Sequence, residues 1–414
     1  MNVFRITGGR RIFGRARLDS AKNAVLPILA ASMLTEQPVT IEGFPELSDT
    51  RNMLKILTTL GCKYELTGDV VTIDAGIASK WEMPDALSKA IRSSIFMLGP
   101  IIGRFRKAVV TYPGGCEIGL RPIDLHIKGL KALGAKIREQ HGMIYCDGSN
   151  LRGATVHLDF PSVGATENLM MAAATAPGTT VIHNPAREPE IVDLARFMSA
   201  MGAKIRGAGS GSITIEGVKR LNGTRFRPMP DRIVAGTLLT AAAMTGGEIE
   251  LENAVLSDMG AVVDKLQRAG CAFGCSDGIM SMRAPEKLKA IEVSTQPFPG
   301  FPTDMQAQFM AMSCVADGVG VIVENVFENR FSHACELRRM GADIIINDRI
   351  AVIRGGVLTG ARIAARDLRA GAALVLAGLA ADGVTEVEGA NIIDRGYVKL
   401  EKILSDLGAA VERI

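Results

Sequence analysis

The sequence predicts an α/β protein made of six copies of one repeat, with three repeats in each of two domains. Three observations support this prediction. The chain has 414 residues, which is too long for one ordinary hydrophobic core. A short tripeptide centred on glycine recurs every 67 to 73 residues, and alanine-rich segments regularly precede β-branched ones. We therefore expect compact domains whose helices are buried and whose sheets lie outside.

The recurring tripeptide predicts the end of a helix. Each copy follows an amphipathic run and precedes a strand-like one. The central glycine is the residue that most readily adopts the left-handed conformation of a helix C-terminal cap. The six copies are Leu60–Cys62, Leu133–Ala135, Met201–Ala203, Ala269–Cys271, Met340–Ala342 and Leu407–Ala409.

The alanine-rich segments predict a second helix in each repeat. They are apolar nearly all round, and a helix of that kind is buried. Each leads into a β-branched strand, so a repeat reads helix, strand, loop, helix, strand, with further short strands. The helix and strand pairs are Ala24–Leu34 with Val39–Ile41, Glu167–Ala174 with Thr180–Ile182, Val234–Met244 with Glu248–Glu250, Gln306–Val315 with Gly320–Val323, and Ala372–Ala380 with Thr385–Val387. Solenoid repeats are usually shorter, so we favour closed domains that meet near Pro228–Asp231.

Composition and charge exclude several classes of protein. Hydrophobic residues make up 47% of the chain and charged residues 22%, which is typical of a globular protein. A net charge of +3 is too small for a protein that binds nucleic acid by neutralising phosphates. The apolar runs are shorter than a membrane span, and Met1–Leu18 has no apolar core typical of a signal peptide. We therefore expect a cytoplasmic protein with neither nucleic acid nor membrane as a partner.

The cysteine and histidine spacings do not predict a metal or nucleotide cofactor. Seven cysteines suggest free thiols. Cys271 and Cys275 have no histidine or second cysteine pair nearby that would complete a zinc site. No HExxH, Walker or dinucleotide motif is present. Six of the cysteines lie in helix-like or strand-like segments and are expected to be inert, whereas Cys116 lies in a glycine-flanked loop where Arg121 would favour its reactive thiolate.

Cations recur where helices are expected to begin. A cation opposes the helix dipole there, so these residues need another explanation, and binding of an anionic ligand is the simplest. The arginines concerned are Arg92, Arg121, Arg330, Arg369 and Arg395. Asp49 and Asp231 occupy similar positions, and for them a helix-capping role and a ligand-binding role both remain open.

Eight segments spread along the chain resemble the UDP-N-acetylglucosamine 1-carboxyvinyltransferase family, the enolpyruvyl transferases that open peptidoglycan synthesis. The segments are Ser20–Ala24, Pro113–Pro122, Ser162–Thr166, Ala186–Asp193, Phe301–Gln308, Phe327–Phe331, Asp367–Arg369 and Asp394–Tyr397. The resemblance implies a two-domain inside-out α/β barrel with six βαβαββ-type repeats. It places the first domain at residues 22–229 and the second at 1–21 plus 230–414.

The resemblance also implies the reaction. Phosphoenolpyruvate would give its enolpyruvyl group to the 3-hydroxyl of UDP-N-acetylglucosamine by addition and elimination through a tetrahedral intermediate, and phosphate would be released. No cofactor or metal would be needed, and the enzyme is expected to be a monomer. We expect cationic groups from both domains to surround the donor beside Cys116.

Particular roles follow from the resemblance. Cys116 would protonate the methylene carbon of phosphoenolpyruvate, and it is the position that the inhibitor fosfomycin alkylates. Asp304 would accept the proton of the sugar hydroxyl. The residues that would bind the substrates or the intermediate are Lys22, Asn23, Arg92, Arg121, Pro122, Ile123, Asp124, Leu125, Ser162, Val163, Gly164, Val326, Arg330, Asp367, Arg369 and Arg395.

Three alternatives are weighed against this assignment. The shikimate-pathway enolpyruvyl transferase would share the fold and the donor, but the Cys116 loop and the Ser162–Gly164 segment favour a nucleotide-sugar acceptor. A non-catalytic paralogue that binds the nucleotide sugar is disfavoured because Lys22, Cys116 and Asp304 are all present. An RNA-end-processing enzyme of related repeat fold is rejected because this chain lacks the nucleotide-transfer histidine motif of such enzymes and has a low net charge.

Overall fold

The computed structural model describes residues 2–83, 85–90, 92–112, 119 and 122–414. Contacts divide the chain into two compact units, which are described separately below. Unit 1 combines the N-terminal stretch up to Leu18 with Pro230–Ile414, and unit 2 is drawn from Asp19–Met229.

Unit 2 contains three βα repeats with their connecting segments. Its helices are α1 (Lys22–Ala31), α2 (Ser48–Thr59), α3 (Asp85–Ala90), α4 (Leu98–Phe105), α5 (Asp124–Ala132), α6 (Val163–Ala173) and α7 (Pro189–Ala200), with 3-10 turns η1 (Ser32–Leu34) and η2 (Arg92–Met97). Its strands are β3 (Val39–Glu42), β4 (Lys63–Thr67), β5 (Val70–Asp74), β6 (Lys107–Thr111), β7 (Lys136–Gln140), β8 (Met143–Asp147), β9 (Thr155–His157), β10 (Thr179–His183), β11 (Lys204–Arg206), β12 (Ser212–Glu216) and β13 (Arg225–Phe226).

Unit 1 repeats the same plan. Its helices are α8 (Arg232–Met244), α9 (Gly260–Arg268), α10 (Gln306–Ser313), α11 (Ala334–Arg339), α12 (Leu368–Ala380), α13 (Ala390–Ile393) and α14 (Leu400–Asp406), with 3-10 turns η3 (Leu256–Asp258) and η4 (Thr303–Met305). Its strands are β1 (Val3–Thr7), β2 (Phe13–Arg17), β14 (Glu248–Glu252), β15 (Ala272–Ser276), β16 (Ile279–Arg283), β17 (Glu292–Ser294), β18 (Val319–Val323), β19 (Asp343–Asn347), β20 (Ile350–Arg354), β21 (Arg362–Ala364), β22 (Val384–Glu388) and β23 (Ala410–Arg413).

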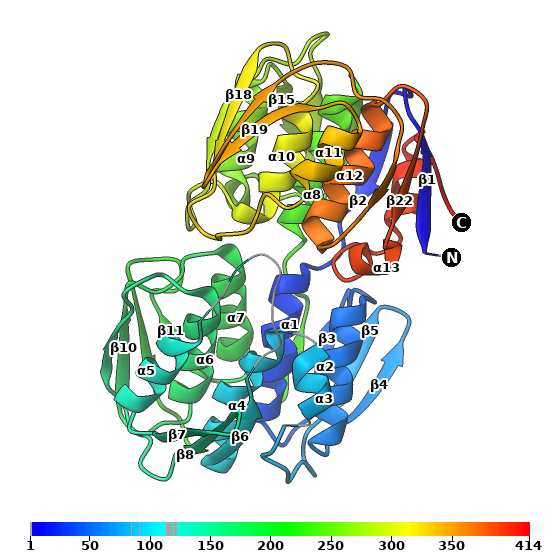
Figure 1. The fold of residues 1–414 in the computed structure, drawn as a ribbon. Helices are drawn as coiled ribbons and strands as arrows, with labels where there is room; N and C mark the ends of the chain where they lie inside the picture. The colour runs from blue at the N-terminus through cyan, green and yellow to red at the C-terminus, as the bar shows by residue number, and fades with distance from the viewer. Residues whose placement is uncertain (1, 84, 91, 113–118, 120–121) are drawn as a thin grey trace. The chain divides into compact units, whose positions relative to one another are not determined.

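The alanine-rich helices lie in the interior of each unit, as their apolar composition predicts. All eight residues of α10 are buried, and eleven of the thirteen residues of α12 are buried. The strands alternate between buried and more exposed residues, as in β5 and β20, because one face of each sheet covers the helices. Figure 1 shows α8, α10 and α12 in the middle of unit 1 and α1, α4 and α6 in the middle of unit 2, with strands around them.

Every one of the six recurring glycines ends a helix in the left-handed conformation. Their φ angles lie between 92° and 106°. The residue after each glycine donates its N–H back to a carbonyl of the last helical turn, as Ala342 does to Leu337 at 3.1 Å and Cys271 does to Leu266 at 3.0 Å. These bonds satisfy carbonyls that the helix end leaves open. The tripeptide prediction is therefore confirmed.

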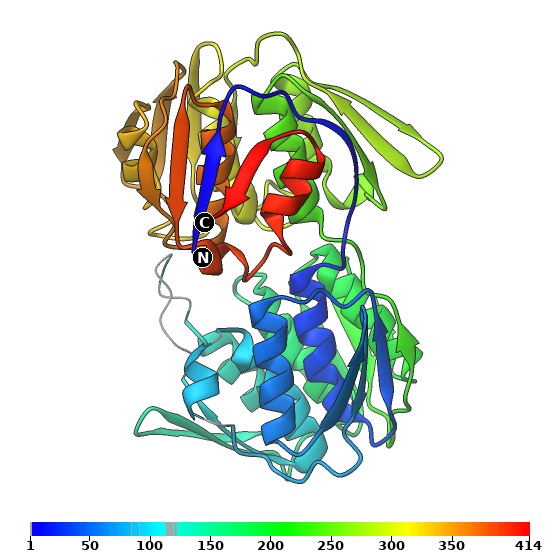
Figure 2. The same ribbon diagram turned by 90° about the vertical axis from the view of Figure 1, so that its right-hand side faces the viewer.

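The described strands form five four-stranded sheets and one three-stranded sheet. In four of the four-stranded sheets, three antiparallel strands are joined by one parallel edge strand, as β17 joins β18. The three-stranded sheet β6-β8-β7 is antiparallel throughout. The fifth four-stranded sheet has the order β21-β22-β1-β23, in which β21 is the parallel edge strand and β1 pairs antiparallel with both neighbours. Figure 2 shows this N-terminal strand, in blue, beside the red C-terminal strand. Phe4 and Ile6 of β1 are buried, so residues at the two ends of the chain complete one hydrophobic core.

The described cysteines differ in exposure. Cys275 and Cys335 are exposed, whereas Cys62, Cys146, Cys271 and Cys314 are buried. Cys275 lies on β15, an edge strand in which four of the five residues are exposed. Over the described ranges, no helix combines the length and apolar character needed to cross a bilayer.

Candidate active site

Asp304 lies at the centre of a buried cluster of charges in unit 1. It belongs to η4, directly before α10. Arg330 contacts its Oδ1 through Nη2 at 3.0 Å, and Arg369 contacts its Oδ2 through both Nε and Nη2 at 3.1 Å. The two arginine side chains are 4% and 3% exposed, whereas the Asp304 side chain is 26% exposed. One carboxylate thus holds two buried guanidinium groups and remains accessible to solvent.

Asp367 and Arg369 are fixed by the start of α12. Asp367 is the N-cap residue, and its Oδ1 accepts the backbone N–H groups of Arg369 and Ala370 at 2.9 and 3.1 Å. Burial opposes the charge of Arg369, but the neighbouring Tyr397 and Asp304 outweigh it and raise the pKa of the guanidinium. Burial lowers the pKa of nearby His333 to about 4, although Asp367 works in the opposite direction. His333 is therefore neutral beside this charged cluster.

Glu324 organises the loop that carries Val326. Its buried carboxylate accepts the N–H groups of Val326 and Phe327 at 2.8 and 3.1 Å, and also the hydroxyls of Thr295 and Thr303 at 2.8 and 2.9 Å. Thr303 is the residue before Asp304. Glu324 therefore anchors both the Val326 loop and the turn that presents Asp304.

Arg395 follows the short helix α13 and is half-buried. Its neighbour Asp394 accepts a hydrogen bond from Arg413 Nη1 of β23 at 2.8 Å. Because that ion pair joins the end of α13 to the C-terminal edge strand β23, it helps to fix the backbone that carries Arg395. Asn391, on the same helix, is exposed.

Lys22 is the first residue of α1 in unit 2. Its Nζ lies 3.6 Å from Asp49 Oδ2, and the two side chains are only 10% and 5% exposed. Asp49 is in the first turn of α2, where a carboxylate also complements the helix dipole. It does not cap that helix, because Leu47 is the N-cap residue. Asn23 follows Lys22 and is half-buried.

Asp231, the other aspartate for which capping and ligand binding were open, is an N-cap. Its Oδ1 accepts the N–H groups of Ile233 and Val234 at the start of α8. Arg232, the first residue of that helix, carries its guanidinium 5.7 Å from the Phe298 ring.

Ser162, Val163 and Gly164 form the start of α6. Ser162 is the N-cap, and its hydroxyl accepts the N–H of Ala165 at 3.3 Å. A side chain at Gly164 would come within 3.1 Å of the His126 ring. His126 Nδ1 lies 2.7 Å from Asn168 Nδ2, which also donates to the carbonyl of Ile95. The absence of a side chain at Gly164 thus lets α6 pack closely on α5.

Glu167 is a carboxyl buried in α6 with both oxygens unbonded. It is 1% exposed. Burial raises its pKa well above the ordinary value, and Glu190 and Glu188 add to the effect because they are negative. Its surroundings therefore favour the protonated carboxyl over the carboxylate.

The remaining predicted residues lie around the start of α5 or outside the described part of the chain. Pro122 and Asp124 are exposed, Ile123 is buried, and Leu125 is half-buried at the start of α5. Cys116, Arg121 and the side chain of Arg92 lie outside the described residues. The structure therefore brings together Asp304, Arg330 and Arg369 in unit 1, and Lys22 with Asp49 in unit 2.

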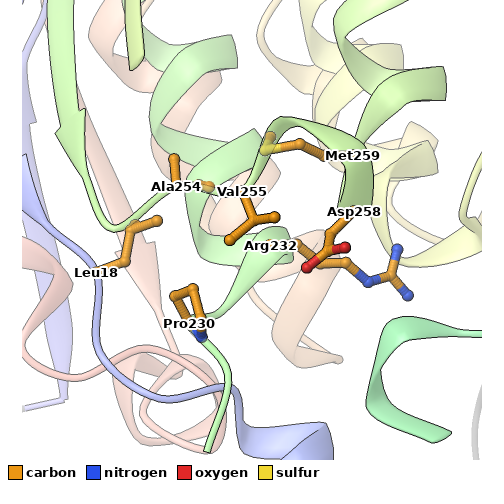
Figure 3. A pocket seen from close by; sticks show the side chains of 8 residues that line it. Leu18, Pro230, Arg232, Ala254, Val255, Asp258 and Met259 are labelled. Carbon is orange, nitrogen blue, oxygen red and sulfur yellow. The ribbon is translucent and has the colours of Figure 1, made fainter. Parts of the chain in front are cut away.

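A small surface hollow also lies in unit 1. Figure 3 shows it among Leu18, Pro230, Val255, Met259 and the side chains of Arg232 and Asp258. It shares no lining residue with the Asp304 cluster, and its mainly apolar lining does not suit an anionic donor. We do not assign the chemistry to it.

Sequence reasoning missed several buried polar residues that support these clusters. Glu324, Gln308 and Thr237 are each at most 1% exposed, and no role was predicted for them. A signal was present for two of them, because Thr237 and Gln308 are polar residues within helices that are apolar all round. Glu167 in α6 carries the same signal.

Comparisons with known proteins identify the family of the chain. The family model of EPSP synthase (3-phosphoshikimate 1-carboxyvinyltransferase) matches residues 6–404. The chain is 49% identical over its full length, and over the full length of the relative, to UDP-N-acetylglucosamine 1-carboxyvinyltransferase 2 of Caldanaerobacter subterraneus subsp. tengcongensis. It is 48% identical to UDP-N-acetylglucosamine 1-carboxyvinyltransferase 1 of Carboxydothermus hydrogenoformans, over 100% of this chain and 99% of the relative.

Solved structures show the same fold. The enolpyruvyl transferase NikO of Streptomyces tendae superposes with a TM-score of 0.89 at 24% identity, over 99% of this chain and 98% of that one. EPSP synthase of Acinetobacter baumannii gives a TM-score of 0.76 at 20% identity, over 100% and 99% of the two chains. On the full-length family match and these relatives, the chain belongs to the enolpyruvyl transferase family.

Proposed function

We propose that this protein transfers the enolpyruvyl group of phosphoenolpyruvate to the 3-hydroxyl of UDP-N-acetylglucosamine in the cytoplasm, as the first committed step of peptidoglycan synthesis. One observation carries the proposal: relatives with that activity in their names are 48–49% identical over the whole chain. We further propose that each unit is an inside-out α/β barrel of three repeats, which the buried helices support.

The chemistry proposed for unit 1 centres on Asp304. Protonation of the donor's methylene carbon leaves an oxocarbenium-like centre at C2. The sugar oxygen bonds to that carbon and becomes acidic as the bond forms, so even a carboxylate that two arginines hold can accept its proton. Arg330 and Arg369 support this role because they fix the carboxylate at 3.0–3.1 Å. Loss of phosphate and of one proton from the methyl carbon, which the thiolate left on Cys116 would accept, then restores the double bond.

Cationic side chains would bind the phosphate and carboxylate groups of the donor. Lys22 and Arg395 are proposed to bind the phosphate and carboxylate of phosphoenolpyruvate together with Arg121, while Arg92 contacts both substrates. Such preorganised charge is usually the largest catalytic contribution. Lys22 is well suited because the buried Asp49 carboxylate, 3.6 Å away, keeps its ammonium group in place. Cys116 is proposed to supply the proton for the methylene carbon.

The nucleotide sugar is proposed to contact residues of unit 2 and the Val326 loop. Asn23 would orient the reacting hydroxyl, and the segments 121–125 and 162–164 would contact the nucleotide and sugar. The N–H groups at the start of α6 favour an anionic group. Asp367 would help to stabilise the tetrahedral intermediate through its link to Arg369.

A direct assay separates this function from its rivals. The purified protein is mixed with phosphoenolpyruvate and either UDP-N-acetylglucosamine or shikimate 3-phosphate, and released phosphate is measured while mass spectrometry identifies the product. We expect phosphate and an enolpyruvyl ether with the nucleotide sugar alone. Turnover of shikimate 3-phosphate would favour the shikimate enzyme instead. Binding of the nucleotide sugar without turnover, in a protein that is folded by calorimetry, would favour a non-catalytic paralogue.

A further inference from the structure

A network of buried hydrogen bonds joins three polar side chains in the core of unit 1. Thr237 is on α8, Gln308 is on α10, and Tyr397 follows α13; all are at most 1% exposed. The Tyr397 hydroxyl lies 3.0 Å from Thr237 Oγ1, and Gln308 Nε2 donates to Thr237 Oγ1 at 3.0 Å and to Tyr397 Oη at 3.3 Å. The surrounding residues are hydrophobic.

The direction of these bonds follows from counting protons. Thr237 donates its only hydroxyl proton to the carbonyl of Ile233 at 2.7 Å. Its oxygen can therefore only accept, so Tyr397 must donate to it and accept from Gln308. Burial raises the pKa of the Tyr397 hydroxyl, which keeps this donor protonated. The position of the tyrosine is thus set by two helices at once.

The ring of Tyr397 in turn faces Arg369. The guanidinium carbon lies 5.3 Å from the ring centroid, a distance at which a cation is attracted to an aromatic face. The close approach depends on Gly396, because a Cβ at that position would come within 2.6 Å of Leu368 Cδ1 on α12. Arg369 then contacts Asp304 with Nε and Nη2.

Stability alone does not explain this arrangement. A phenylalanine, a leucine and a valine would fill the same core without polar groups, and burying polar groups costs free energy unless all are satisfied. Gln308 Oε1 has no hydrogen-bond partner, so the network retains part of that cost. A satisfied polar network does, however, restrict the positions of its members.

We propose that Tyr397 is a positioning residue: anchored by Thr237 and Gln308, it holds the guanidinium of Arg369 in place and thereby orients the Asp304 carboxylate toward the acceptor hydroxyl. The inference rests on the proposed function, in which Asp304 accepts the acceptor's proton. Tyr397 itself touches no reacting atom in this scheme. Its effect should therefore appear in turnover rather than in substrate affinity.

The test compares Tyr397→Leu, Tyr397→Phe and Thr237→Val with the wild type. A misplaced catalytic group costs up to roughly 100-fold in rate, so we expect Tyr397→Leu to lower kcat by about 10- to 100-fold while the KM values of both substrates change less than about 3-fold. Tyr397→Phe keeps the ring against Arg369 and should recover most of the lost rate. Thr237→Val should fall between them. The acidic limb of the pH–kcat profile should move to higher pH in Tyr397→Leu, because the loosened guanidinium favours the ionised carboxylate less.

Phe309→Leu is the matched control for a structural effect. Phe309 lies on the same helix as Gln308, is fully buried, and packs edge-on against Phe301 with ring centroids 4.8 Å apart. It should reduce stability as Tyr397→Leu does but leave kcat and the pH profile unchanged. Equal losses of kcat in the two variants would reduce Tyr397 to a packing residue.

Asp304→Asn separates failure of this inference from failure of the proposed function. Wild-type turnover in Asp304→Asn would remove the base role itself. If Asp304→Asn is impaired but Tyr397→Leu keeps the wild-type kcat and pH profile, the positioning role alone is wrong. If both are correct, Tyr397→Leu adds almost nothing in the Asp304→Asn background, since the group that it orients is already gone. Should Tyr397→Leu fail to fold, Thr237→Val in the same two backgrounds gives the same decision, with Tyr397→Phe as the control that keeps the ring.

Discussion

Replacing Glu167 with glutamine should change how the stability of unit 2 depends on pH. The carboxyl is buried, neither oxygen is bonded, and the two neighbouring charges that affect it, Glu190 and Glu188, are both negative. Its pKa in the folded protein is therefore well above the ordinary value of 4.5. Between those two values the folded chain holds one proton that the unfolded chain has lost. The free energy of unfolding must then fall as pH rises.

The size of this pH effect follows from the one proton that the folded chain holds and the unfolded chain has lost. A difference of one bound proton changes the free energy of unfolding by about 1.4 kcal/mol for each pH unit. Glutamine has nearly the same shape and no titration, so this slope disappears in Glu167→Gln. From the ordinary pKa up to the raised pKa, the variant should gain about 1.4 kcal/mol relative to the wild type for each pH unit, and for a unit of this size each kcal/mol shifts Tm by about 2–4 °C. At pH 5 the two proteins should be nearly equal.

The single tryptophan makes the measurement specific. Trp81 is the only tryptophan in the chain and lies in unit 2, so its fluorescence during urea unfolding follows that unit. The control is Glu65→Gln, an exposed glutamate on β4, which should leave the pH dependence as it is in the wild type. Parallel stability curves for wild type and Glu167→Gln between pH 5 and pH 8 would show that Glu167 is ionised in the folded protein and would refute the reasoning.

Three further predictions concern separate features. Cys116→Ala should abolish or severely reduce turnover, whereas Cys116→Asp should keep measurable activity and resist fosfomycin, since a carboxylic acid can donate a proton but is a poor nucleophile toward an epoxide; equal inhibition of that variant and the wild type would contradict the assigned role. Asp231→Ala should destabilise unit 1 by about 1 kcal/mol through loss of the α8 cap, and Asp231→Asn, which keeps an acceptor oxygen, should lie close to the wild type in calorimetry. Deleting residues 2–8 removes the buried Phe4 and Ile6 and should cost unit 1 roughly 3–6 kcal/mol, while the Trp81 unfolding transition of unit 2 stays in place.

Local features of the fold could be predicted from the sequence because they depend on local chemistry. The six glycine caps require a left-handed residue at a helix end, and each of the six has that conformation. The buried helices were equally predictable, since a segment that is apolar all round has no face to offer water. The second repeat lacks an obvious alanine-rich segment, yet α4 followed by β6 takes its place.

Long-range pairings could not be predicted in the same way. Nothing in Val3–Thr7 indicates that this strand inserts between β22 and β23, nearly 400 residues away. The arginines show the same limit. Their positions predicted an anion, but the sequence could not show that Arg330 and Arg369 already share the carboxylate of Asp304, which is separated from them by 26 and 65 residues.

This internal anion changes how the arginines should be understood. If Arg330 and Arg369 were simple receptors for substrate charge, an aspartate between them would compete with the ligand. Because Arg330 and Arg369 already bind Asp304, they instead fix its carboxylate. That carboxylate also neutralises part of their charge before any substrate binds. We propose that the donor is bound instead by Lys22 and Arg395, with Arg92 and Arg121. Replacing Lys22 should therefore weaken binding of phosphoenolpyruvate, whereas replacing Arg369 should act mainly on the step in which the acceptor hydroxyl loses its proton.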